Sequence, residues 1–117
     1  MTEELIDPIR CHPILKQKIW GGTQLPQLKL AKTDIVSPIG ESWEISGLDG
    51  QESIVATGRY EGLCLSQLID RLQVSLMGHA NYQKYGNRFP LLIKLIDSSQ
   101  DLSVQVHPSD SIAQQQD

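Results

Sequence analysis

The sequence has few of the features that usually assign a function directly. Its 117 residues include two cysteines, and aromatic residues make up only 5% of the chain. Cys11 and Cys64 lie far apart and belong to no paired motif, so neither a disulfide framework nor a cysteine-rich metal site is indicated. We therefore interpret both cysteines as free thiols in a reducing compartment.

Charge and hydrophobicity exclude two further classes of protein. The chain has 10 basic and 14 acidic residues, and its net charge of −4 is spread along the sequence. Such a chain offers no basic surface to nucleic acid or to an anionic membrane. No apolar run approaches the ~20 residues that a membrane span requires. The acidic N-terminus lacks the apolar core of a signal peptide, so we expect a cytoplasmic protein.

The pattern that is present predicts a single domain over residues 1–117. Alternating residues predict a strand over 40–47 and a second strand over 53–56, joined as a hairpin. Leucines at helical spacing predict a helix over 65–77, and polar residues predict a connector over 79–88. The expected fold class is mainly β with one or two helices (α+β).

The most informative stretch, residues 89–108, predicts a second hairpin. Residues 91–97 are almost continuously apolar, whereas residues 102–107 alternate strictly between apolar and polar. The four residues 98–101 have turn composition. If they form the loop, Lys94 lies opposite Gln105 and the two strands share their faces.

This hairpin would have one apolar and one polar face. The apolar face, which we expect to belong to the core, contains Leu91, Ile93, Leu95, Leu102, Val104 and Val106. The polar face contains Lys94, Ser103, Gln105 and His107. A polar cluster of this kind is unsuited to a core, so it is the first candidate for a functional site.

The residues of the polar face have chemical roles that the sequence leaves open. Gln105 and His107 leave the same strand face, and both side chains can ligate a divalent metal. A lone strand histidine is nevertheless more often a packed or hydrogen-bonded residue. Lys94 can bind a phosphate or an oxyanion, but an edge lysine commonly extends into water. Ser103 can donate to a phosphate oxygen or simply be a small strand residue.

Two other segments contribute candidates. Trp20, followed by a predicted turn at Gly21 and Gly22, would form either an apolar wall for a sugar ring or part of the core. Glu41 and Glu44 are three residues apart on a predicted strand and therefore lie on opposite faces. They are not a paired acid and base.

Three motifs together resemble a known family. WGG at residues 20–22, GESWEIS at 40–46 and FPLLIKLIDSSQDLSVQVHPSD at 89–110 have the order and approximate spacing found in type I phosphomannose isomerases. The resemblance covers essentially the whole chain but only the N-terminal portion of the family's sequence. It implies a partial cupin-like (jelly-roll) β-sandwich, and we expect the chain to be truncated after the VHP motif.

The resemblance also implies a function. Members of this family are zinc enzymes that interconvert mannose 6-phosphate and fructose 6-phosphate, so the implied partner is a sugar-phosphate substrate. Gln105 and His107 would be two zinc ligands, whereas Trp20, Lys94 and Ser103 would contact the substrate. The family takes further ligands, a glutamate and a histidine, from downstream, and residues 109–117 contain neither. The implied zinc ligand set is thus incomplete, and no catalytic base is assigned.

A second hypothesis is a non-catalytic cupin-like binding or oligomerisation module. An incomplete barrel leaves a sheet edge exposed, which either a homodimer or a missing C-terminal segment would cover. The first hypothesis predicts isomerase activity only with the missing segment. The second predicts a discrete oligomer without zinc.

Overall fold

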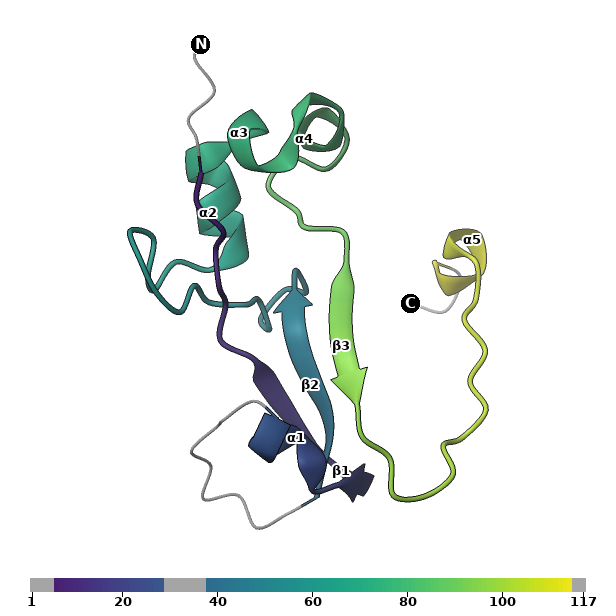
Figure 1. Cartoon of the computed structure of the whole chain (residues 1–117). Coiled ribbons are helices and arrows are strands. Elements are labelled where there is room, and N and C mark those ends of the chain that lie inside the picture. Colours follow the sequence, from purple (N-terminus) through teal and green to yellow (C-terminus); the bar gives the residue numbers. More distant parts are fainter. Residues whose placement is uncertain (1–5, 29–37, 115–117) are drawn as a thin grey trace.

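The computed structural model describes residues 6–28 and 38–114 and contains one antiparallel sheet (Figure 1). The sheet has the order β1-β2-β3, with β1 at Ile14–Gly22, β2 at Ile39–Ser46 and β3 at Leu92–Ile96. The helices of the described residues are α1 (Gln24–Leu28), α2 (Leu65–Leu72), α3 (Val74–Met77), α4 (His79–Tyr85) and α5 (Asp110–Ala113). The predicted α+β class is confirmed, with more helices than expected.

The central strand β2 is the most buried part of the sheet. It corresponds to the predicted strand at 40–47, and it pairs with β1 on one side and with β3 on the other. Trp43 lies opposite Ile14 of β1 and Lys94 of β3. Because both edges of β2 are paired, its apolar and small side chains are enclosed; Ile39 and Ser42 are almost fully buried.

The hydrophobic core lies beyond one end of the sheet, where α2, α3 and α4 gather (Figure 1). Leu65, Leu68 and Leu72 leave α2 at helical spacing and pack on Val55. The predicted helix over 65–77 is interrupted at Gln73, whose positive φ of 49° ends α2 before α3 begins. The core is small, since it is formed by one amphipathic helix and the adjoining loops.

Two other local predictions are wrong. Residues 53–56 do not form a strand; Ile54 and Val55 make only isolated bridges, to Cys64 and Cys11 respectively. The predicted polar connector at 79–88 contains the helix α4. This helix buries no side chain, so its sequence lacks the apolar periodicity from which a helix is predicted.

The predicted hairpin at 91–107 is also wrong in its second half. The chain after β3 is drawn to the end of β1: Ser98 bridges to Gly21, and the Ser99 amide donates to the Trp20 carbonyl at 2.8 Å. The Gly22 amide donates in turn to the Asp97 carbonyl at 3.0 Å. As a result residues 102–107 form no strand, although β3 itself was predicted correctly.

The expected turn at Gly21 and Gly22 is instead the end of β1. A Cβ atom on Gly21 would lie 2.5 Å from the backbone nitrogen of Gly40, a contact that no larger residue avoids. Gly21 is therefore explained by the close approach of β1 to β2, whereas a Cβ atom on Gly22 would meet the side chain of Asp97.

The expected apolar core face is exposed in this structure. Its members on β3 are only half-covered, and those on residues 102–107 extend into solvent; Val104 is 96% and Val106 is 89% exposed. None of the helices in the described residues is long and apolar enough to cross a membrane.

The small core makes a clear prediction for stability. Leu68→Ala removes a side chain that is 1% exposed, so we expect it to lower the free energy of unfolding by about 2–5 kcal/mol in a urea titration. The matched control is Leu28→Ala in α1, where the leucine is 68% exposed and the loss should stay below about 0.5 kcal/mol. Equal losses for the two variants would contradict the location of the core.

Candidate functional site

A cavity of about 150 Å³ lies between the sheet and the segment that follows it. Its lining residues are Trp20, Glu41, Lys94, Ile96, Leu102, Ser103 and Gln105. Four of the five residues predicted from the sequence as site residues are among them. The cavity thus joins the end of β1, the centre of the sheet and the start of the C-terminal segment, which are far apart in the sequence.

The centre of this site is an ion pair between Glu41 of β2 and Lys94 of β3. The Lys94 Nζ lies 3.1 Å from the Glu41 Oε1, and the indole Nε1 of Trp43 donates to the Glu41 Oε2 at 2.8 Å. Both contacts follow from the sheet register, because Trp43 lies opposite Lys94 and Glu41 is two residues along the same strand face. Lys16 completes the cluster from β1, with its ammonium 4.3 Å from the centre of the Trp43 ring.

The electrostatics of the pair fix the charge of Glu41. Burial raises the pKa of this carboxyl group, but hydrogen bonds from Trp43 and Lys94, together with the charges of Lys94 and Lys18, outweigh it and leave the pKa below its ordinary value. Glu41 is therefore a carboxylate at neutral pH. It holds the Lys94 ammonium beside the cavity, where the lysine side chain keeps 34% of its surface exposed.

Trp20 is held at the cavity by its backbone. The Ser99 hydroxyl donates to the carbonyl oxygens of Trp20 and Gly21, at 3.1 and 3.0 Å. The Asp97 carboxylate accepts the amide of Gln24 at 2.9 Å, which ties the start of α1 to the same loop. The wall formed by Trp20 is thus positioned by the residues between β3 and the C-terminal segment.

The two predicted metal ligands are placed differently. Gln105 lines the cavity, but His107 is not among the residues that do. Both side chains are exposed. Nowhere in residues 6–28 and 38–114 do three or more His, Cys, Asp or Glu side chains form a group that could hold a metal ion. The described residues alone do not fit a complete zinc site, since such sites normally have at least three protein ligands.

Glu41 lines the cavity, although the sequence analysis named it only as half of a rejected acid and base pair and assigned it no role at the site. Strand alternation placed it correctly on the face of Trp43, but nothing in the local pattern shows that β3 pairs with β2 and brings Lys94 to it. In the observed register Glu41 lies opposite Ile96, so it reaches Lys94 as the diagonal neighbour on the same face of the sheet.

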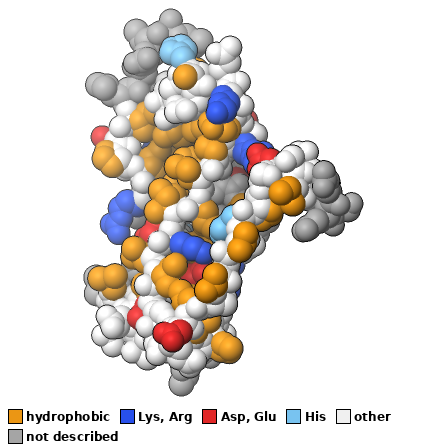
Figure 2. All heavy atoms as spheres, turned by 90° about the vertical axis from the view of Figure 1, so that its right-hand side faces the viewer, with side chains coloured by type: hydrophobic (Ala, Val, Ile, Leu, Met, Phe, Trp, Pro, Cys, Tyr) orange, Lys and Arg blue, Asp and Glu red, His pale blue; other side chains and the backbone are white. Residues whose placement is uncertain are grey.

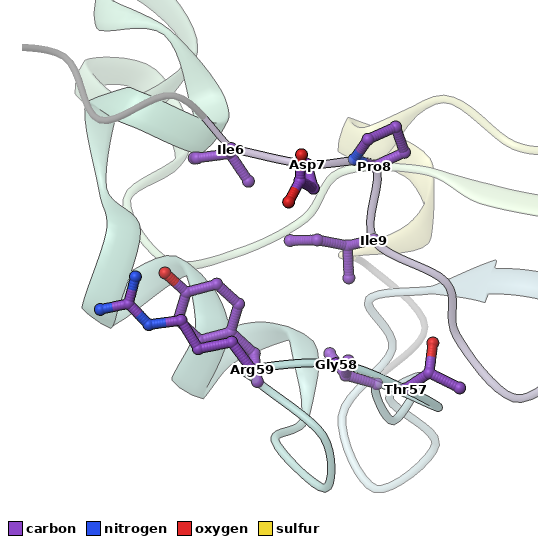
Figure 3. Close-up of a pocket in the computed structure, with 9 residues that line it drawn as sticks. Ile6, Asp7, Pro8, Ile9, Thr57, Gly58 and Arg59 are labelled. Carbon is purple, nitrogen blue, oxygen red and sulfur yellow. The ribbon is translucent and has the colours of Figure 1, made fainter.

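A further cavity, also of about 150 Å³, lies away from these residues (Figure 3). The N-terminal segment Ile6, Asp7, Pro8 and Ile9 forms one side of it, and the loop of Thr57, Gly58 and Arg59 forms the other. It contains none of the residues predicted for the site.

Comparison with known proteins supports the resemblance noted from the sequence. The family model described as phosphomannose isomerase type I, catalytic domain, matches residues 9–117. Mannose-6-phosphate isomerase ManA of Bacillus subtilis is 39% identical over 107 residues, which are 92% of this chain and 32% of that protein. A mannose-6-phosphate isomerase of Streptococcus mutans is 36% identical over 110 residues, 93% of this chain and 33% of its own length.

Solved structures agree with the sequence relatives. The crystal structure of the Bacillus subtilis mannose 6-phosphate isomerase matches with a TM-score of 0.75 and 38% identity, over 92% of this chain and 32% of that one. A phosphomannose isomerase structure from Salmonella typhimurium, at 24% identity and a TM-score of 0.71, shows the shared fold alone.

The sheet, its helices and the structural match define a cupin-like α+β protein, as the sequence analysis predicted. More specifically, the chain belongs to the type I phosphomannose isomerase family. It spans about a third of the length of the curated relatives that it matches.

The ion pair makes a prediction about pH. Because the pKa of Glu41 is lowered by folding, its stabilising contribution is present above the ordinary glutamate pKa of about 4.3 and is lost as the pH falls through the lower, folded value. Glu41→Gln keeps an acceptor for Trp43 but removes the charge. We expect it to lower the free energy of unfolding at pH 7 by about 1 kcal/mol, a modest loss because Lys94 is partly solvated.

The measurement is urea unfolding of the parent and of Glu41→Gln between pH 7 and pH 3. The difference in free energy between them should shrink below about pH 4.3. Glu61→Gln, at an exposed carboxylate in a turn, is the control and should change the free energy of unfolding at pH 7 by less than about 0.5 kcal/mol. A difference that grows on acidification would contradict the lowered pKa.

Proposed function

We propose that this chain provides part of the substrate site of a mannose-6-phosphate isomerase, which interconverts mannose 6-phosphate and fructose 6-phosphate. The observation that carries the proposal is the cavity that joins Trp20, Lys94, Ser103 and Gln105. Membership of the family supports this assignment of the reaction, since the relatives from Bacillus subtilis and Streptococcus mutans are mannose-6-phosphate isomerases.

The proposed roles follow from the chemistry of each side chain. Lys94 is a cation beside the cavity and attracts the anionic part of a sugar phosphate. Ser103 donates a hydrogen bond to the same group, and the Trp20 ring forms an apolar wall for the sugar. Glu41 acts through Lys94, whose ammonium it keeps at the cavity, and is therefore a positioning residue.

Glu41 is not proposed as the base that moves the proton between C1 and C2 of the sugar. Its carboxylate is already engaged by Lys94 and Trp43, and its lowered pKa makes it a weak proton acceptor. The base is thus assigned to no residue of the described chain.

Gln105 and His107 are proposed as two ligands of a zinc ion. Two ligands do not complete a zinc site, so the proposal requires further ligands from outside these residues, and we derive no reaction step through the metal. We also propose a cytoplasmic location. Two cysteines that remain free, Cys11 and Cys64, are in keeping with a reducing compartment.

The test is a chimera in which this chain replaces the matching 32% of the Bacillus subtilis isomerase. The chimera should interconvert the two sugar phosphates. Lys94→Met in the chimera should lower kcat/KM by roughly 10- to 100-fold, because it removes one hydrogen bond to the charged group of the substrate. The control is Lys84→Met, at an exposed lysine of α4, which should change kcat/KM less than about twofold.

An active chimera that is insensitive to Lys94→Met would contradict the assigned substrate site. A folded but inactive chimera would contradict the proposal that these residues serve an isomerase.

A further inference from the structure

The part of β1 that contains Trp20 departs from regular pairing with β2. Gln17 and Gly22 both lie opposite Ile39 of β2, and the register of the ladder shifts between them. The four residues in between therefore bulge out of the ladder, and we call residues 18–21 the β1 arch. Bulges change the direction in which a strand presents its side chains. The arch is thus the segment that decides where the Trp20 ring lies.

The β1 arch packs against Gly40, the second residue of β2. A Cβ atom added to Gly40 would lie 2.7 Å from the Cζ3 atom of Trp20 and 2.7 Å from the Cβ and Cγ atoms of Lys18. The backbone of the arch is equally close, since a Cβ atom on Gly21 would lie 2.5 Å from the Gly40 nitrogen. The arch therefore occupies the space that a side chain at position 40 would need.

Gly40 is held in this position by both neighbouring strands. Its carbonyl accepts the Asp97 amide at 2.9 Å, directly after β3. On the side of β1, the register between Lys16 and Gln17 skips Gly40, which is the extra residue of a β-bulge. A side chain at position 40 would therefore have to push the arch aside, because Gly40 itself is bonded to the other edge of the sheet.

The backbone of the arch is also held, by the loop after β3. The Ser99 hydroxyl donates to the carbonyl oxygens of Trp20 and Gly21, at 3.1 and 3.0 Å. A larger residue at position 40 would thus displace the side chains that lie in its place, the Trp20 ring and the stem of Lys18. Lys18 is exposed and is not among the residues that line the cavity, so the site would be affected through Trp20.

The position of the Trp20 ring matters because the cavity has a charged part and an apolar part. Glu41 and Lys94 form the charged part, whereas Trp20, Ile96 and Leu102 supply apolar groups. Figure 2, which looks onto the side of the molecule that includes β3, shows basic and acidic side chains among hydrophobic ones. A sugar phosphate can contact the Trp20 ring and Lys94 together only if the two are correctly spaced.

We propose that Gly40 is a positioning residue of the substrate site. Its lack of a side chain leaves room for the β1 arch and so sets the place of the Trp20 ring relative to Lys94. The inference rests on the proposed function, in which this ring is the wall for the sugar. It adds a reason for the glycine that begins the GESWEIS motif: Gly40 serves the site through Trp20.

The first test uses the unmodified 117-residue chain and requires no activity. The α-proton of Gly40 that takes the place of a Cβ atom points at the Trp20 ring. Proton NMR should therefore show a nuclear Overhauser effect between this proton and Hζ3 of Trp20. The control is the contact of Gly47 with the Phe89 Cβ, at the other end of β2. If the control contact is seen and the Gly40 contact is not, the proposal is wrong whatever the protein does.

The second test is kinetic and uses the chimera described above. Gly40→Ala should raise KM for mannose 6-phosphate by roughly tenfold, through the loss of about 50 Å² of apolar contact with the sugar. It should change kcat less than about twofold, because a wall that holds the substrate and the transition state equally contributes uniform binding. The control is Ile39→Val at the preceding, buried residue, which should lower stability but change KM less than about twofold.

A double-mutant cycle shows whether Gly40 acts through Trp20. When Trp20 is replaced by alanine, adding Gly40→Ala should change KM less than about twofold. Additive effects of the two substitutions would contradict the proposal, as would a KM that responds to Trp20→Ala but not to Gly40→Ala; both results leave the proposed function in place. An active chimera whose KM is unchanged by Trp20→Ala would overturn this inference together with the proposed role of Trp20.

Discussion

The pairing between Asp97–Ser99 and the end of β1 is the interaction on which the rest of the structure depends. It joins the residues that directly follow β3 to Trp20, Gly21 and Gly22, over a separation of more than 70 residues in the sequence. The same hydrogen bonds position Trp20 at the cavity and set the direction of the chain that follows. The polar cavity and the exposed side chains of Val104 and Val106 are therefore consequences of one local arrangement.

Much of the fold follows from the sequence where the hydrophobic pattern is strong. The strand at β3 and the helix at α2 were predicted from periodicity, and the polar residues predicted to share a face do meet, apart from His107. The hairpin failed because a turn-like composition at 98–101 does not show which strand the loop bonds to. The composition of residues 98–101 predicts that the chain turns there. It does not predict that the Ser99 amide donates to the Trp20 carbonyl, because that contact depends on the tertiary structure.

The site shows the same division between local and tertiary information. Alternation placed Lys94 and Ser103 on the polar side, whereas Glu41 became visible only with the pairing of β2 and β3. Residues that line one cavity from three separate segments cannot be arranged by spacing alone. The chain spans about a third of the length of the relatives that it matches, and its described residues hold no group of three or more His, Cys, Asp or Glu side chains that could bind a metal ion.

Amide hydrogen exchange would test this account most directly, because it reports the pairing itself. The account predicts slow exchange for the amides of Gly22, Asp97 and Ser99, which donate to backbone carbonyls at 2.8 to 3.0 Å. The amides of residues 102–107 should exchange at nearly the rate of an unfolded chain, since these residues form no strand. Slow exchange at residues 102–107 together with fast exchange at Gly22 and Ser99 would contradict it, because that pattern belongs to a hairpin between β3 and residues 102–107.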